Sequence, residues 1–208
     1  MTTKSISSFS EKDVQIEERQ EVYNGFFRLH KYRLRHRLFA GGWSDTMVRE
    51  VFERGCAVSV LPYDPVRDEV VLIEQFRIGA MPTSPSPWLY ECVAGNIEPG
   101  EAPEQVCRRE AEEEAGLKLG RLHLMMSYLS SPGGTSERLY LYMAECDSHN
   151  AGGIFGLDEE HEDIRVVTMK SAQALEMLEA GQIDNAAAVI SLQWFALNKD
   201  KVLQQWCK

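Results

Sequence analysis

The sequence predicts an α+β fold, in which an N-terminal antiparallel sheet (residues 1–55) precedes a larger domain (residues 56–208) of mixed strands and helices. Two observations predict this organisation. Residues 28–55 alternate apolar and polar side chains with the period of β-strands. From residue 56 onward, strand-like and helix-like segments follow each other without a regular β-α-β alternation, which argues against a doubly wound Rossmann domain.

The N-terminal sheet is predicted from two strands, 28–39 and 46–55, which are joined by a hairpin turn in the stretch FAGGW. In the first strand, Lys31 and Arg33 fall on one face and His30 falls on the other. A small antiparallel sheet buries little apolar surface by itself. We therefore expect this sheet to be exchanged between two copies of the chain in a homodimer.

The larger domain combines short strands with three helices. The predicted strands are 56–64, 68–77, 88–95, 122–130, 138–146 and 163–169, and the predicted helices are 103–116, 171–181 and 185–206. Pro103 suits the first turn of the first helix, and Gly116 ends it. The other two helices are predicted from apolar residues that recur with helical spacing.

Composition and charge exclude several classes of protein. The net charge of -10 argues against a chain that coats nucleic acid or an anionic membrane, because either partner needs a positive surface. No run of eighteen apolar residues occurs, and the first residues form no apolar signal segment. The five cysteines form no C-x-x-C pair, which is typical of a reducing compartment. We expect a cytoplasmic protein without a nucleic-acid or membrane partner.

The predicted helix 103–116 is crowded with glutamates. Glu112 follows Arg108 by four residues, and Glu113 follows Arg109 by four residues, so each is predicted to form an ion pair along the helix. These two glutamates are therefore explained by local pairing.

Glu110 and Glu114 are predicted to face each other without a cation of their own. Such a pair of like charges destabilises an exposed helix by roughly 0.2–0.5 kcal/mol. The plain interpretation is a solvated acidic face. A divalent cation between the two side chains is the alternative, and oxygen ligands without His or Cys favour Mg²⁺, or Mn²⁺ as its substitute, over Zn²⁺.

The spacing around this helix distinguishes the two interpretations. From Gly95 to Leu117 the chain reads Gly, five residues, Glu101, seven residues, Arg109-Glu110, two residues, Glu113-Glu114, one residue, Gly116 and Leu117. This pattern resembles the Nudix box, the signature of hydrolases that split a nucleoside diphosphate linked to another group. The family usually has a larger aliphatic residue where Ala111 stands.

The resemblance implies a Nudix fold, with mixed sheets sandwiched between helices and a loop-helix-loop that holds the metal. It implies that Glu110 and Glu114 bind the metal together with the backbone carbonyl of Ala94, and that Glu113 is a further or supporting ligand. It also implies a structural ion pair between Arg109 and Glu101.

A second acidic segment follows three glycines in NAGGIFGLDEEHEDI, residues 150–164. Its plain interpretation is a solvated loop tip. Glycines also allow such a loop to close over a substrate. Similarity to ADP-ribose pyrophosphatases of the family implies that Glu160 is the general base and Glu162 an additional metal ligand. Glu159 is the alternative base, and His161 is expected to be a bystander.

The stretch SYLSSPGGTSER places Pro132 sixteen residues after Gly116, as in the ADP-ribose branch of the family. The GDP-mannose branch resembles this stretch as well and is the alternative, as is a sensor that binds ADP-ribose without cleaving it. The resemblance implies substrate contacts from four further residues. These are Arg77 to a phosphate, Phe26 stacked on adenine, Arg49 from the other subunit, and Glu137.

Overall fold

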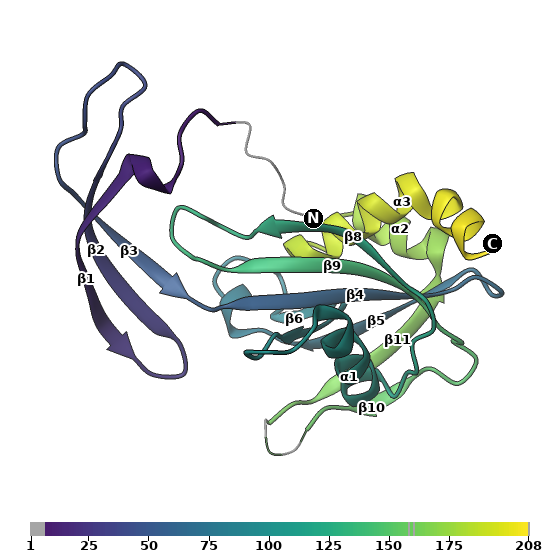
Figure 1. Ribbon diagram of the computed structural model, residues 1–208. Helices are drawn as coiled ribbons and strands as arrows, with labels where there is room; N and C mark the ends of the chain where they lie inside the picture. The colour runs from purple at the N-terminus through teal and green to yellow at the C-terminus, as the bar shows by residue number, and fades with distance from the viewer. Residues whose placement is uncertain (1–6, 158, 160, 208) are drawn as a thin grey trace. The chain divides into compact units, whose positions relative to one another are not determined.

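The computed structural model describes residues 7–157, 159 and 161–207. Figure 1 shows the elements, which we label in chain order. The strands are β1 (Val14–Asn24), β2 (Arg28–His36), β3 (Met47–Glu53), β4 (Cys56–Asp64), β5 (Glu69–Phe76), β6 (Trp88–Glu91), β7 (Val93–Asn96), β8 (Leu122–Leu129), β9 (Arg138–Glu145), β10 (Gly153–Phe155) and β11 (Ile164–Lys170). The helices are η1 (Glu11–Asp13), η2 (Ile78–Ala80), α1 (Pro103–Ala115), α2 (Ser171–Glu179) and α3 (Ala186–Trp206).

The chain forms two compact units. One contains the chain up to Gly55 together with Leu129–Glu137, and the other contains Cys56–Tyr128 and the chain from Arg138 onward. The segment 129–137 therefore folds with the N-terminal strands although it lies far from them in the sequence.

The first unit is a three-stranded antiparallel sheet in the order β1-β2-β3. The predicted hairpin between β2 and β3 is confirmed: Leu38 donates to the carbonyl of Gly42, and Gly41 and Gly42 both adopt positive φ. Sequence analysis missed β1. Every residue of that strand is exposed, so no alternation of buried and exposed positions marks it.

The segment 129–137 is attached to β3 by backbone and side-chain hydrogen bonds. The Phe52 amide donates to the Gly134 carbonyl at 2.8 Å, and the Thr135 hydroxyl donates to the Phe52 carbonyl at 2.8 Å. The Glu137 carboxylate lies 3.3 Å from the Arg54 guanidinium. These contacts place Glu137 in the same unit as β1–β3.

The second unit is built on one eight-stranded mixed sheet in the order β10-β11-β5-β4-β9-β8, in which β6 also pairs with β5 and β7 with β4. Strands β4 and β9 pair in parallel, whereas the pairs β10–β11, β11–β5, β4–β5, β4–β7 and β5–β6 are antiparallel. The strand predicted over 88–95 is in fact two strands, which pair with different neighbours on either side of Cys92. The short β10, within the glycine-rich stretch, was also missed.

An apolar core covers each face of the sheet, so the central strands are buried on both sides. On β5, Val71 and Ile73 pack in the core that contains Val106 and Ala111 of α1, whereas Val70 and Leu72 pack in the core that contains α3. Figure 1 shows α1 on one side of the sheet and α2 and α3 on the other. This arrangement confirms the predicted α+β Nudix fold with helices on both faces.

Helix α1 begins and ends as predicted. Pro103 occupies its first turn, and Gly116 ends it in the left-handed conformation at φ 63°. Ala111 is fully buried, so its small side chain allows α1 to lie close to the sheet. The helices α2 and α3 also agree with the prediction. No helix within the described ranges combines the length and apolar character that a membrane span requires.

Candidate active site

Glu114 is the most enclosed carboxylate of α1, with 4% of its surface exposed. The amide of Ala94, in β7, donates to its Oε2 at 3.1 Å. Burial raises the pKa of Glu114 to about 8, and the Ala94 hydrogen bond offsets only part of that effect. Helix α1 therefore holds this carboxylate directly against the backbone that precedes Gly95.

Glu110 lies one turn earlier, and its side chain crosses the backbone of Gly95. A Cβ atom at Gly95 would come within 1.8 Å of the Glu110 carboxylate, so only glycine leaves room for it. Burial raises the pKa of Glu110 to about 7 against the opposing effect of the Arg109 charge. The Arg109 guanidinium lies 2.9 Å from Glu110, so the prediction that Glu110 has no cation of its own was wrong.

Arg109 organises the rest of the box. Its guanidinium donates to Glu113 at 3.0 Å, as predicted, and lies 3.7 Å from Glu101 in the preceding loop. The predicted pair between Arg108 and Glu112 is not what the structure contains. Arg108 donates instead to the carbonyl oxygens of Leu119 and Gly120, because these lie just beyond the end of the helix and need a donor.

Arg77 follows β5 and joins this group of charges. Burial lowers the pKa of Arg77, but the carboxylates of Glu91, Glu114 and Glu162 outweigh burial and raise it, so the guanidinium lies in the field of these carboxylates. Its direct partner is Glu91 of β6, which accepts from Arg77 Nη2 at 2.8 Å and from Nε at 3.0 Å. Sequence analysis missed Glu91, because only the pairing of β6 with β5 brings it beside Arg77.

Glu162 closes the base of the second acidic loop. Its amide donates to the Leu157 carbonyl at 3.2 Å, and its carboxylate accepts from the Leu157 amide at 3.4 Å. Its charge acts on both Glu110 and Glu114. Glu159 is exposed. Glu160, predicted as the general base, lies outside the described residues.

Three predicted substrate contacts belong to the N-terminal unit. Phe26 is 89% exposed and meets Phe27 edge to face at 4.7 Å between ring centroids. Arg49, on β3, is exposed and donates to the Val48 carbonyl. Glu137 is paired with Arg54. Phe26, Arg49 and Glu137 thus lie in the N-terminal unit. The larger unit contains Arg77, Ala94, Glu110, Glu114 and Glu162.

The carboxylates of α1 fit a divalent cation by their chemistry. Within the described ranges, no three His, Cys, Asp or Glu side chains gather closely enough to form a metal site by themselves. Glu110 and Glu114, however, are buried acids whose raised pKa values disfavour the charged form. A bound cation would supply the missing positive charge and displace their protons, and hard oxygen ligands suit Mg²⁺.

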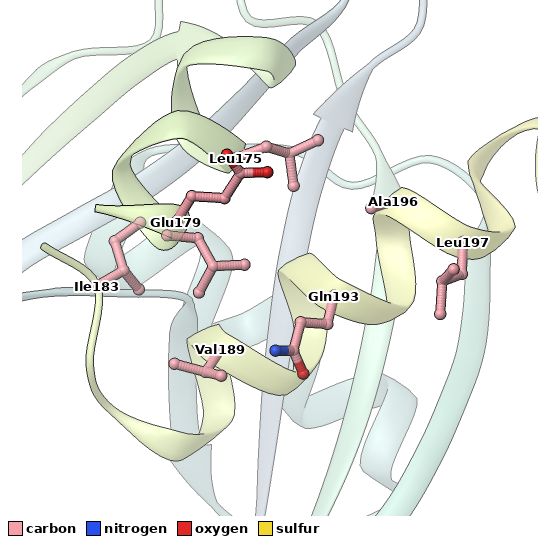
Figure 2. Close-up of a pocket in the computed structure, with 8 residues that line it drawn as sticks. Leu175, Glu179, Ile183, Val189, Gln193, Ala196 and Leu197 are labelled. Atoms are coloured by element: carbon pink, nitrogen blue, oxygen red, sulfur yellow. The ribbon is translucent and has the colours of Figure 1, made fainter. Parts of the chain in front are cut away.

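A hollow of about 590 Å³ lies elsewhere, between α2 and α3. Figure 2 shows Leu175 and Glu179 of α2 on one side of it and Val189, Gln193 and Leu197 of α3 on the other. Its lining is mostly apolar and includes none of the carboxylates of the box. It is therefore separate from the candidate active site.

The sheet, the buried carboxylates and the glycine that admits one of them define a Nudix-type site. Residues 53–189 match the NUDIX domain family, and the chain belongs to that family.

Two relatives of known name match most of the chain in sequence. An ADP-ribose pyrophosphatase of Escherichia coli strain K12 is 54% identical over 199 residues, which are 96% of this chain and 95% of the relative. A GDP-mannose pyrophosphatase of Enterobacter sp. strain 638 is 37% identical over 154 residues, which are 72% of this chain and 78% of the relative. A crystal structure of an ADP compounds hydrolase shares the fold, with a TM-score of 0.71 at 20% identity over 96% of this chain and 98% of that one.

Proposed function

We propose that this chain hydrolyses the pyrophosphate of ADP-ribose to AMP and ribose 5-phosphate, with a divalent cation that we take to be Mg²⁺. The observation that carries the proposal is the 54% identity, along nearly the full length, to an ADP-ribose pyrophosphatase. The pair Glu110 and Glu114 supports the proposal, because two carboxylates of raised pKa can bind a divalent cation. Such a cation would neutralise the charge of an anionic substrate.

The residues divide into three roles. Glu110, Glu114 and the Ala94 carbonyl, assisted by Glu113 and Glu162, would hold the cations. When bound, these supply the positive charge that a diphosphate needs and polarise the attacking water. Every other contribution comes from side chains.

Arg77 binds a phosphate oxygen, since its guanidinium lies in the field of Glu114 and Glu162 and can donate to an anion there. Glu160 accepts the proton of the attacking water, with Glu159 as the alternative base. Leu157 and Glu162, which flank these two residues in the sequence, are hydrogen-bonded to each other.

GDP-mannose is the alternative substrate, because a GDP-mannose pyrophosphatase is 37% identical to the chain. Turnover of ADP-ribose and GDP-mannose should be compared at equal Mg²⁺, with AMP and GMP release as the readouts. We expect kcat/KM for ADP-ribose to be higher by at least about tenfold, which corresponds to one additional hydrogen bond of about 1.4 kcal/mol. A preference for GDP-mannose would overturn the assignment, and tight binding of ADP-ribose without AMP release would support a sensor.

We also propose that the enzyme acts as a cytoplasmic homodimer. The exposed strand β1 and the exposed Phe26 support this, because the N-terminal unit presents apolar side chains that a second copy would cover. All five cysteines are free thiols, and burial raises the pKa of Cys92 and Cys107 to about 12, so these two are inert. Free thiols suit a reducing compartment.

Subunit mixing tests the dimer and the assignment of Arg49 together. Arg49→Ala and Glu114→Gln are each expected to lose activity as pure proteins. In a mixed dimer, the subunit with intact Glu114 receives an intact Arg49 from its partner, so one complete site forms. Activity that reappears on mixing supports exchange of Arg49 between subunits, whereas an inactive mixture whose heterodimers are demonstrated by native mass spectrometry contradicts it.

A further inference from the structure

Glu91 and Arg77 form a two-point contact beside the carboxylates of the Nudix helix. Glu91 Oε2 accepts from Arg77 Nη2 at 2.8 Å and from Nε at 3.0 Å, and Nε also lies 3.3 Å from Oε1. The contact occupies one edge of the guanidinium. The register of β5 and β6, which pairs Ile73 with Glu91, brings the Glu91 side chain to the same face of the sheet as Arg77.

Glu91 is itself held in place. Its side chain is only 14% exposed, and the amide of Gln75 donates to its Oε2 at 3.1 Å. Gln75 is buried, with 5% of its surface exposed, and lies two residues before Arg77 on the same face of β5. The carboxylate is therefore fixed from one side by a buried amide and presented to the guanidinium on the other.

The charge of Glu91 opposes the binding of phosphate at this place. Glu114 and Glu162 already place negative charge around Arg77, and the Glu91 carboxylate cancels a further part of the positive charge that Arg77 brings to them. A half-buried ion pair also contributes little net stability, because desolvation offsets the attraction. What the contact does provide is orientation, since a two-point bond fixes a planar guanidinium in a way that a single bond does not.

We propose that Glu91 is a positioning residue for the diphosphate: it holds the Nε–Nη2 edge of Arg77 so that the Nη1 side of the guanidinium is presented to a phosphate oxygen. The proposal rests on the proposed function, because it takes the ligand of Arg77 to be the diphosphate of a nucleotide. Among the described residues, Glu91 accepts the hydrogen bonds that the Arg77 side chain donates, and these come from Nε and Nη2.

A double-mutant cycle tests whether Glu91 acts through Arg77. Glu91→Gln keeps the size and one acceptor but loses the charged two-point contact, and is expected to lower kcat/KM for ADP-ribose about tenfold. Glu91→Ala removes the contact and is expected to lower it by about 10², the order that misplacement of a binding group costs. In the Arg77→Ala background, both changes should have almost no further effect.

The cycle separates positioning from a structural role. If Glu91 only stabilises the sheet, its replacement lowers kcat/KM by the same factor with or without Arg77, or the loss follows a lowered melting temperature. Either result overturns the proposal. Glu91→Gln keeps the test decisive if Glu91→Ala does not fold.

The pair Arg121–Glu145 supplies a matched control. Arg121 donates Nε and Nη2 to Glu145 at 2.8 and 2.7 Å, a similar two-point contact in the same unit, but between β9 and the loop before β8. Glu145→Gln is expected to leave kcat/KM unchanged. If it lowers kcat/KM as much as Glu91→Gln does, loss of any such pair explains the effect and the proposal fails.

A binding measurement tests the positioning role of Glu91 separately from the proposed hydrolysis of ADP-ribose. The dissociation constant of ADP, measured by calorimetry on the same six proteins (the unchanged protein, the three single variants and the two double variants), requires no turnover. If the unchanged protein does not cleave ADP-ribose, the proposed function fails, and the coupling is read from ADP affinity alone. Coupled effects of Glu91 and Arg77 on ADP affinity support positioning, whereas additive effects, or no effect of Glu91, contradict it.

Discussion

Gly95 is the residue whose side chain, or lack of one, decides where Glu110 can lie. A methyl group there would meet the Glu110 carboxylate at 1.8 Å, and the adjoining β7 backbone contacts Glu114 as well. The glycine of the box is thus explained by a close approach of helix and strand and not by turn geometry, because Gly95 lies within β7 and does not adopt a positive φ.

We predict that Gly95→Ala lowers kcat/KM for ADP-ribose by about 10², because the Glu110 carboxylate must move by more than 1 Å. The free energy of unfolding should fall by about 1–3 kcal/mol through overpacking. Gly79→Ala is the control, since nothing lies within 4 Å of a Cβ there. Steady-state kinetics and urea unfolding measure both effects, and an unchanged kcat/KM in Gly95→Ala would contradict this account of the site.

Glu160 is the proposed general base, and Glu159 is the alternative. We predict that Glu160→Gln lowers kcat by about 10²–10⁴, the usual contribution of a general base, with ADP affinity and cation binding retained. Glu159→Gln should reduce kcat only slightly. Rapid-quench measurement of AMP formation gives both rates, and a larger loss in Glu159→Gln would transfer the assignment to that residue.

At the scale of elements, Gly116 lies where the end of α1 packs against the short strand β10. It ends the helix at φ 63°, and a Cβ atom there would lie 2.6 Å from the ring of Phe155. The same glycine therefore serves the end of the helix and the packing of the strand that leads into the second acidic loop.

Gly116→Ala should lower the free energy of unfolding by about 2–4 kcal/mol, from backbone strain together with the displaced ring. Gly181→Ala provides the comparison, because Gly181 has φ 69° but nothing within 4 Å of its Cβ position. Gly181→Ala therefore introduces backbone strain alone and should lower the free energy of unfolding by about 1 kcal/mol. Thermal and urea unfolding give the difference, and equal losses at the two glycines would show that contact with Phe155 contributes nothing.

The elements that could be predicted from the sequence are those whose side chains alternate between burial and exposure, or whose ends carry a glycine or proline. Strand β5 and helix α1 are of this kind. Strand β1 is not, since all of its positions are exposed and no alternation of buried and exposed side chains marks it. Strand β10 is three residues long and follows glycines, so neither propensity nor period indicates it.

The same limit applies to the candidate site. The spacing of the box predicts which glutamates gather on α1, because a helix relates them by fixed intervals. It does not predict Glu91, which reaches Arg77 through a strand pairing, nor the partner of Arg108, which tertiary carbonyl groups capture. Contacts between elements depend on how the chain folds back, and no local pattern encodes them.

At the scale of the whole molecule, Asp64 connects distant parts of the chain. It is buried at the end of β4, and its carboxylate accepts from the amides of Val66, Arg67 and Ser148 and from the Arg67 guanidinium. Burial alone would raise the pKa of Asp64, but these donors outweigh it and hold the pKa well below the usual 3.8.

Because the folded-state pKa lies below the unfolded one, the contribution of Asp64 to stability is fully present above the unfolded pKa. It is lost as the pH falls from there toward the folded-state value. We predict that Asp64→Asn lowers the free energy of unfolding by about 2–4 kcal/mol at pH 7. The difference from the unchanged protein should shrink below about pH 4. Urea unfolding across this range measures it, and a difference that grows on acidification would contradict the assignment.

We propose that the buried carboxylates of α1 act by holding cations against a nucleotide diphosphate. AMP release from ADP-ribose, measured against Mg²⁺ concentration for the unchanged protein and Glu114→Gln, tests it most directly. The unchanged protein should be inactive in EDTA and saturate with Mg²⁺, and Glu114→Gln should need far more Mg²⁺ and lose at least about 10² in rate. Hydrolysis that persists in EDTA, or a Glu114→Gln protein with an unchanged Mg²⁺ dependence, would contradict the claim.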